Sequence, residues 1–172
     1  MKKIDVRVIT QCAVFVALMA VASQIYVPTP VVPITLQCFV ISTCGYYLGL
    51  KRGLISVGVY LLLGIIGVPV FSGFGGGLYA LLGPSGGFIM GFLPLCALCA
   101  IAFDKWQGIL LGILGVLICH AAGSLWYSYV GGVDVLSAFV SVSLPFLLKD
   151  VILLVASYFL ARLLRKRISR RA

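Results

Sequence analysis

Long apolar stretches separated by short loops constrain this chain more than any other feature. They cover approximately residues 6–26, 35–50, 54–67, 88–103, 108–129 and 136–164. Hydrophobic residues make up 62% of the 172 residues and charged residues 10%, against about 45–50% and about 25% in soluble domains. A helix that crosses about 30 Å of hydrocarbon needs roughly 20 apolar residues. The sequence therefore predicts an all-α membrane protein with six transmembrane helices in a single integral domain, residues 1–172.

Basic residues mark one side of the expected membrane. Of the thirteen Lys and Arg residues, twelve lie on the side of the two termini: Lys2, Lys3, Arg7, Lys51, Arg52, Lys105, Arg162, Arg165, Lys166, Arg167, Arg170 and Arg171. The loops on the other side, residues 27–33, 72–87 and 131–134, carry none. Because cytoplasmic loops are enriched in Lys and Arg, we expect both termini in the cytoplasm. The net charge of +9 follows this pattern and does not indicate a nucleic-acid partner.

The first apolar run is expected to be a retained helix. Residues 8–27 form a longer run than the apolar core of a signal peptide, and no clear cleavage site follows it.

Two adjacent charges interrupt the last apolar run. Lys149 lies about 13 residues after the start of that run, close to the middle of the expected membrane, and Asp150 follows it. A charge at this depth usually faces a cavity or a partner, so we predict that the pair contacts a ligand or a partner. The alternative is that the pair lies near the outer interface and only assists topology. Pro145 should kink the helix just before the pair.

The proline-rich loop 27–33 and the glycine-rich loop 72–87 suggest a pocket. Irregular backbone at membrane depth persists only where it is buried in protein or lines a cavity, and glycines leave backbone N–H and C=O groups accessible to a ligand. Phe74 and Tyr79 lie among the glycines and would supply apolar walls. The alternative is a tight external loop that only packs.

Motifs for catalysis are missing from the sequence. There is no Walker A, H-E-x-x-H or G-x-S-x-G motif and no glutamate, and Asp150 is the only acid within an expected span. His120 is the only histidine, and we expect it to be packed or hydrogen-bonded. Cys96 and Cys99 form a C-x-x-C, but all six cysteines lie in apolar runs, which favours small buried residues over metal ligands. We expect no enzyme and no metal site.

Four motifs in a fixed order resemble those of the BioY family. They are P-V-V-P-I-T-L-Q at 30–37, G-Y-Y-L-G at 45–49, Y-L-L-L-G-I-I-G-V-P-V-F at 60–71 and G-P-S-G-G-F-I-M-G-F at 83–92. Weaker similarity continues with G-S-L-W at 123–126 and L-P-F-L-L-K-D at 144–150. Two departures stand out. The family usually has G-P-T-G-G-Y at the fourth motif, and its last helix usually reads D-x-x-K, whereas here Lys149 precedes Asp150 and Leu153 follows.

The resemblance implies an S component, the substrate-capturing subunit of an energy-coupling-factor (ECF) transporter, in the bacterial cytoplasmic membrane. The implied substrate is biotin, with no covalently bound cofactor. The implied partners are a transmembrane coupling subunit, onto which Ala13 and Ala17 of the first helix dock, and two ATPase subunits that alone hydrolyse ATP. An S component for another vitamin or small metabolite and a solitary biotin transporter are the alternatives.

The chemistry of biotin suggests roles for the candidate residues. Asp150 would accept hydrogen bonds from the ureido N–H groups, and Lys149 would attract the carboxylate. Aromatic side chains would flank the ring system. The complete predicted ligand-binding set is Asp150, Lys149, Phe74, Tyr79, Gln37, Ser85, Trp126 and Tyr127.

Overall fold

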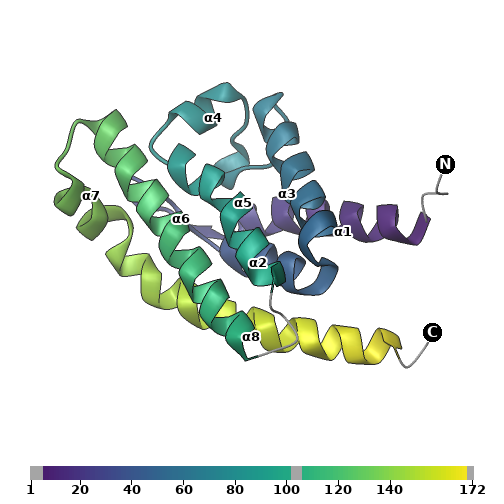
Figure 1. Ribbon diagram of the computed structural model, residues 1–172. Coiled ribbons are helices and arrows are strands. Elements are labelled where there is room, and N and C mark those ends of the chain that lie inside the picture. The colour runs from purple at the N-terminus through teal and green to yellow at the C-terminus, as the bar shows by residue number, and fades with distance from the viewer. Residues whose placement is uncertain (1–5, 102–105, 170–172) are drawn as a thin grey trace.

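Helices form most of the computed structural model, which describes residues 6–101 and 106–169 (Figure 1). The longer helices are α1 (Val6–Gln24), α2 (Gln37–Leu48), α3 (Leu50–Ile65), α5 (Gly86–Ile101), α6 (Gln107–Gly131) and α8 (Leu144–Ser169). Shorter elements join them: β1 (Tyr26–Val27), β2 (Ile34–Thr35), η1 (Ser72–Phe74), α4 (Leu78–Leu82) and α7 (Val135–Val142). Lys105, which the sequence places in a cytoplasmic turn, lies outside the described residues.

Three helices in the described part of the chain are long and apolar enough to cross a membrane. They are α1, α6 and the stretch Leu144–Arg167 of α8, and α5 is a shorter apolar helix. Many of their large apolar side chains are exposed on the outside of the bundle, among them Val21, Leu125 and Ile152. Since a soluble protein rarely exposes extended apolar patches, this surface is that of a membrane protein.

The bundle has two distinct ends. Figure 1 shows that α1 begins and α8 ends at one end of the molecule, whereas α4 and α7 lie at the other. The glycine-rich segment contains η1 and α4, so it is more ordered than a simple loop. The proline-rich segment connects β1 to β2, which pair in antiparallel register with Tyr26 opposite Thr35. Both segments therefore close the end of the bundle opposite the start of α1.

The C-terminal end of α1 fixes the glycine-rich segment in place. The Ser23 hydroxyl donates to the carbonyl of Val70 at 2.7 Å. The Gln24 side-chain amide donates to the carbonyl of Phe71 at 2.9 Å and accepts from the backbone N–H of Phe74 at 3.0 Å. Phe74 needs such support because its φ of 57° is unusual for a residue with a side chain. Gln24 therefore joins the end of α1 to the segment around η1.

Glycines allow α5 and α6 to pack closely. A Cβ built on Gly87 would lie 2.4 Å from the carbonyl oxygen of Ala122, and one on Gly91 would lie 2.8 Å from the Cα of Cys119. Small residues permit this approach between helix backbones in lipid. The contact holds the first turn of α5 beside His120 of α6.

We expect Gly87→Ala to lower the melting temperature of the detergent-solubilised protein. The added methyl group has no room at the α5–α6 contact, and overpacking costs about 1–3 kcal/mol. Gly58→Ala in α3 is the matched control, because nothing lies within 4 Å of its added Cβ and alanine is the better helix former. Equal melting temperatures for the two variants would contradict this account of the packing.

The last predicted helix, residues 136–164, is divided into α7 and α8 at Ser143. Pro145 lacks the backbone N–H that would continue α7 and is tolerated in the first turn of a new helix, and Ser143 leaves the helix with φ −124° and ψ −49°. The Ser143 hydroxyl donates to the carbonyl of His120 at 3.2 Å and lies 2.6 Å from the Ser124 hydroxyl. The break moves Lys149 from the middle of a long helix to the second turn of α8.

Candidate functional site

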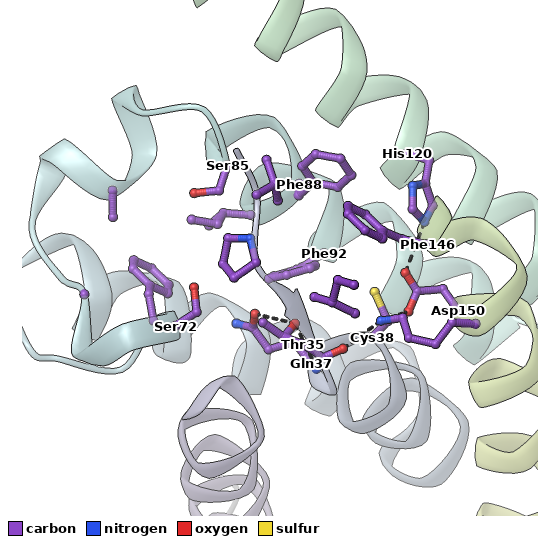
Figure 2. A pocket seen from close by; sticks show the side chains of 18 residues that line it. Thr35, Gln37, Cys38, Ser72, Ser85, Phe88, Phe92, His120, Phe146 and Asp150 are labelled. Carbon is purple, nitrogen blue, oxygen red and sulfur yellow. Dashed lines mark hydrogen bonds and ion pairs between the residues drawn. The ribbon is translucent and has the colours of Figure 1, made fainter. Parts of the chain in front are cut away.

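A cavity lies beneath the proline-rich and glycine-rich segments and among the helices α2, α5, α6 and α8 (Figure 2). The cavity is partly open, and the space between its walls is about 700 Å³ when the open solvent is included. The described residues that line it are Val32, Pro33, Ile34, Thr35, Gln37, Cys38, Phe71, Ser72, Gly75, Ala80, Ser85, Phe88, Ile89, Phe92, His120, Phe146, Lys149 and Asp150.

Asp150 lies at the centre of a buried charged cluster at one end of this cavity. Its Oδ2 is 3.1 Å from Nε2 of His120, and its Oδ1 is 2.8 Å from Nζ of Lys149. The ammonium also donates to the carbonyl of Thr35 at 2.8 Å. Together these contacts join α6, α8 and β2 around a carboxylate that is only 4% exposed. A buried carboxylate requires such partners to offset the loss of hydration.

The cluster retains unused hydrogen-bonding capacity. Asp150 Oδ1 has its ionic contact with Lys149, but among the described residues it has no hydrogen bond of good geometry. Nδ1 of His120 likewise has no hydrogen-bond partner among them. The His120 ring is held edge-on to Phe88, with 5.6 Å between ring centroids. Asp150 Oδ1 and His120 Nδ1 therefore keep hydrogen-bonding capacity that the described residues around them do not use.

Gln37 lines the cavity and forms hydrogen bonds through both ends of its side-chain amide. Its side-chain amide donates to the Tyr60 hydroxyl at 2.6 Å, and its carbonyl oxygen accepts from the Thr35 hydroxyl at 2.9 Å. Tyr60 in turn donates to the carbonyl of Val70 at 2.9 Å. This chain of hydrogen bonds connects α2 and α3 to the segment that leads into η1, so Gln37 both lines the cavity and fixes its walls.

Phenylalanines form the apolar walls. Phe88 and Phe92 come from α5, Phe71 precedes η1 and Phe146 lies in the first turn of α8. None of these four belongs to the ligand-binding set predicted from the sequence. Phe88 and Phe92 are four residues apart, so they lie on one face of α5. This spacing is the sequence signal that could have identified them as neighbours in one wall.

The predicted residues divide into two groups. Asp150, Lys149, Gln37 and Ser85 line the cavity together. Phe74, Tyr79, Trp126 and Tyr127 are not among its described lining residues.

The four aromatic residues outside the cavity have other surroundings. Phe74 and Tyr79 are 73% and 85% exposed on η1 and α4. The Trp126 indole donates to the carbonyl of Gly83 at 2.9 Å and so anchors the start of α5 to α6. Tyr127 is half-buried on the same helix. Phe74 and Tyr79 therefore lie on the outer side of the glycine-rich segment, and Trp126 attaches that segment to α6.

His120 is a functional candidate that the sequence predicted only as a packed or hydrogen-bonded residue. It is buried and hydrogen-bonded, as expected of a lone histidine, but its partner is the carboxylate of the site. Thirty residues separate His120 from Asp150 in the sequence, so no local pattern indicated this contact.

No group of three or more His, Cys, Asp or Glu side chains suited to a metal ion occurs within residues 6–101 and 106–169. All six cysteines are free thiols. Cys38 lines the cavity, and the others lie within helices that pack the bundle.

The sequence is similar to those of known proteins of the BioY family. The sequence profile of the BioY family matches residues 1–170. The probable biotin transporter BioY of Pyrococcus horikoshii is 37% identical over 140 residues, which cover 81% of this chain and 85% of that protein. The biotin transporter BioY of Thermotoga maritima is 33% identical over 164 residues, covering 93% and 96%.

A solved structure has the same fold. It is the crystal structure, at 2.1 Å, of the S component for biotin from an ECF-type ABC transporter. It superposes with a TM-score of 0.87 at 30% sequence identity and covers 94% of this chain and 92% of its own.

Proposed function

Because this chain belongs to the BioY family, we propose that it captures biotin and takes it up across the membrane as the S component of an ECF transporter. It is a transporter and not an enzyme. The observation that carries the proposal is the buried cluster of Asp150, Lys149 and His120 at one end of an apolar chamber. A ureido group offers N–H donors and a C=O acceptor on an otherwise apolar bicycle, and this chamber supplies the complementary groups.

Ligand identification on the purified protein tests this function. Mass spectrometry of the small molecules that co-purify should detect biotin, and titration calorimetry with biotin should show saturable one-site binding. Thiamine and riboflavin serve as controls, since neither carries a ureido ring. Specific binding of one of these vitamins, with no response to biotin, would contradict the assignment.

The partners proposed for this chain are a transmembrane coupling subunit and two ATPase subunits. The S component for biotin with the same fold belongs to an ECF-type ABC transporter, and this chain shows no nucleotide-binding motif of its own. We place the coupling subunit against α1, where Ala13 and Ala17 are both exposed. Small exposed side chains allow a partner helix to approach closely.

The proposed topology has six spans with both termini in the cytoplasm. Arg7 near the start of α1 and Arg162, Arg165, Lys166 and Arg167 near the end of α8 support it, because these two helix ends lie at the same end of the molecule (Figure 1). The cavity then lies toward the outer surface of the cytoplasmic membrane, where a captured vitamin first arrives.

Cysteine labelling in intact cells provides a test of this topology. In a variant without the six native cysteines, Lys51→Cys should resist a membrane-impermeant maleimide until the cells are lysed, because it lies on the cytoplasmic side. Ser137→Cys, which is also exposed but lies in α7, should be labelled in intact cells. The reverse pattern would invert the topology, and labelling of both positions from outside would change the number of spans.

A further inference from the structure

The ionisable side chains of the cavity are confined to one end. His120, Lys149 and Asp150 carry its acid–base groups, with the Cys38 thiol beside them (Figure 2). The opposite end lies against η1 and α4, where the described lining residues are Ser72, Gly75, Ala80 and Ser85. Figure 2 shows Ser72 and Ser85 on the far side of the phenylalanines from His120 and Asp150. The site therefore has a charged end and a neutral end.

The charged end is suited to a ureido ring and poorly suited to a carboxylate. Lys149 is already within 2.8 Å of Asp150 Oδ1 and within 2.8 Å of the Thr35 carbonyl. A ligand carboxylate that approached this ammonium would also approach the Asp150 carboxylate, and two like charges at close range repel each other. A ureido group, in contrast, can donate an N–H to Asp150 and accept from Lys149.

The neutral end offers donors that do not require a negative charge. The hydroxyls of Ser72 and Ser85 can donate to a carboxylate oxygen, an amide carbonyl or an ester carbonyl alike. Ser72, Gly75, Ala80 and Ser85 are all partly exposed, so this end is not sealed around a small group. With the ring at the charged end, the valerate chain of biotin extends to these residues.

We propose that the site recognises the ureido bicycle and not the carboxylate, so that its substrate class includes uncharged amides and esters of biotin. This inference rests on the proposed biotin-binding function and extends it. Lys149, which the sequence analysis assigned to the ligand carboxylate, acts at the ring end with Asp150. The affinity for biotin is then largely independent of the charge on its tail.

The expected effect can be bounded from hydrogen-bond energetics. A neutral hydroxyl prefers a carboxylate over an amide carbonyl by less than about tenfold in affinity. If Lys149 paired with the ligand carboxylate instead, an uncharged amide would leave the desolvated ammonium without its partner. The affinity would then fall by roughly a hundredfold or more. The two arrangements therefore differ enough for binding measurements on one pair of ligands to separate them.

The test compares biotin with biotinamide by titration calorimetry on the full-length protein in detergent. The ratio of the two dissociation constants should stay below about tenfold in the unmodified protein. Lys149→Met should weaken both ligands and leave that ratio unchanged. Lys51→Met removes an exposed lysine outside the cavity and should alter neither constant. Because the ratio is measured within one protein sample, partial misfolding of a variant affects both ligands equally.

The outcomes are distinct. If biotin binds but biotinamide is weaker by more than tenfold, the inference is wrong and the proposed function stands. A ratio that exceeds tenfold and falls toward one in Lys149→Met would assign the carboxylate to Lys149. If neither ligand binds to the folded, unmodified protein, the proposed function itself fails.

Discussion

Asp150→Asn should weaken biotin binding by about tenfold to a hundredfold, as measured by titration calorimetry in detergent. A hydrogen bond to a charged group contributes roughly 1.5–3 kcal/mol, and each 1.4 kcal/mol is a tenfold change in affinity. The asparagine keeps the shape of the side chain and one acceptor, but it loses the charge that strengthens the bond to a ureido N–H. Since Asp150 is the only acid among the described lining residues of the cavity, no neighbour compensates for this loss.

Asp134→Asn is the matched control for this substitution. Asp134 is exposed and caps α7 by accepting hydrogen bonds from the backbone N–H groups of Leu136 and Ser137. Asparagine caps a helix as well as aspartate does, so neither stability nor biotin affinity should change. Wild-type affinity in a folded Asp150→Asn protein would remove Asp150 from the set of ligand contacts.

If Asp150→Asn prevents folding, a second substitution at Lys149 should restore stability. The substitution leaves the partly buried Lys149 without its counter-charge, and an unpaired buried charge destabilises a protein by about 3–5 kcal/mol. The double variant Lys149→Met, Asp150→Asn removes both charges and should restore the melting temperature. Biotin binding should remain weak in this variant, because both partners of the ureido group are absent. Recovery of affinity together with stability would show that Asp150 acts on the fold alone.

The sequence predicted the class of the fold well because that class depends on composition. Apolar runs and the distribution of Lys and Arg are properties of the whole chain, and lipid offers few alternatives to helices. The resemblance to the BioY family and the expectation of a transporter without enzymatic activity are confirmed by the family match and the superposed S component. The helix over residues 136–164 shows the limit of this reasoning. Pro145 indicated a kink, but the hydroxyl contacts of Ser143 with α6 depend on tertiary packing.

The charged residues of the candidate site were the easiest to predict, whereas Gln37 and Ser85 were predicted without such a signal and also line the cavity. Asp150 and Lys149 stand out because a charge in an apolar run requires a reason. His120 had no such signal, since its role depends on a contact 30 residues away in the sequence. Among the aromatic residues, the position in the sequence was misleading about which of them line the cavity. Phe74 and Tyr79 lie among the conspicuous glycines but point outward, whereas Phe88 and Phe92 look like ordinary helix residues and form the wall.

Ala17→Trp should abolish assembly with the coupling module and reduce biotin uptake to background. Ala13 and Ala17 are exposed on α1, whereas Phe15 and Met19 of the same helix are buried in the bundle. Helices that meet through small residues pack with their axes about 8 Å apart. An indole at position 17 holds the partner helix away from this distance. Co-purification of the coupling subunit and uptake in whole cells measure the two effects.

Biotin binding by the isolated Ala17→Trp protein should remain at the wild-type level. Residue 17 lies about 10 Å along the helix from Ser23 and Gln24, which hold the segment covering the cavity. Ala156→Trp is the matched control, because Ala156 is also exposed but lies on α8, where a larger side chain meets lipid. Assembly and uptake should survive in that variant. If both also survive in Ala17→Trp, the coupling subunit binds another face. If biotin binding fails together with assembly, the exposed face of α1 acts on the pocket as well as on the partner, and docking and ligand capture share one helix.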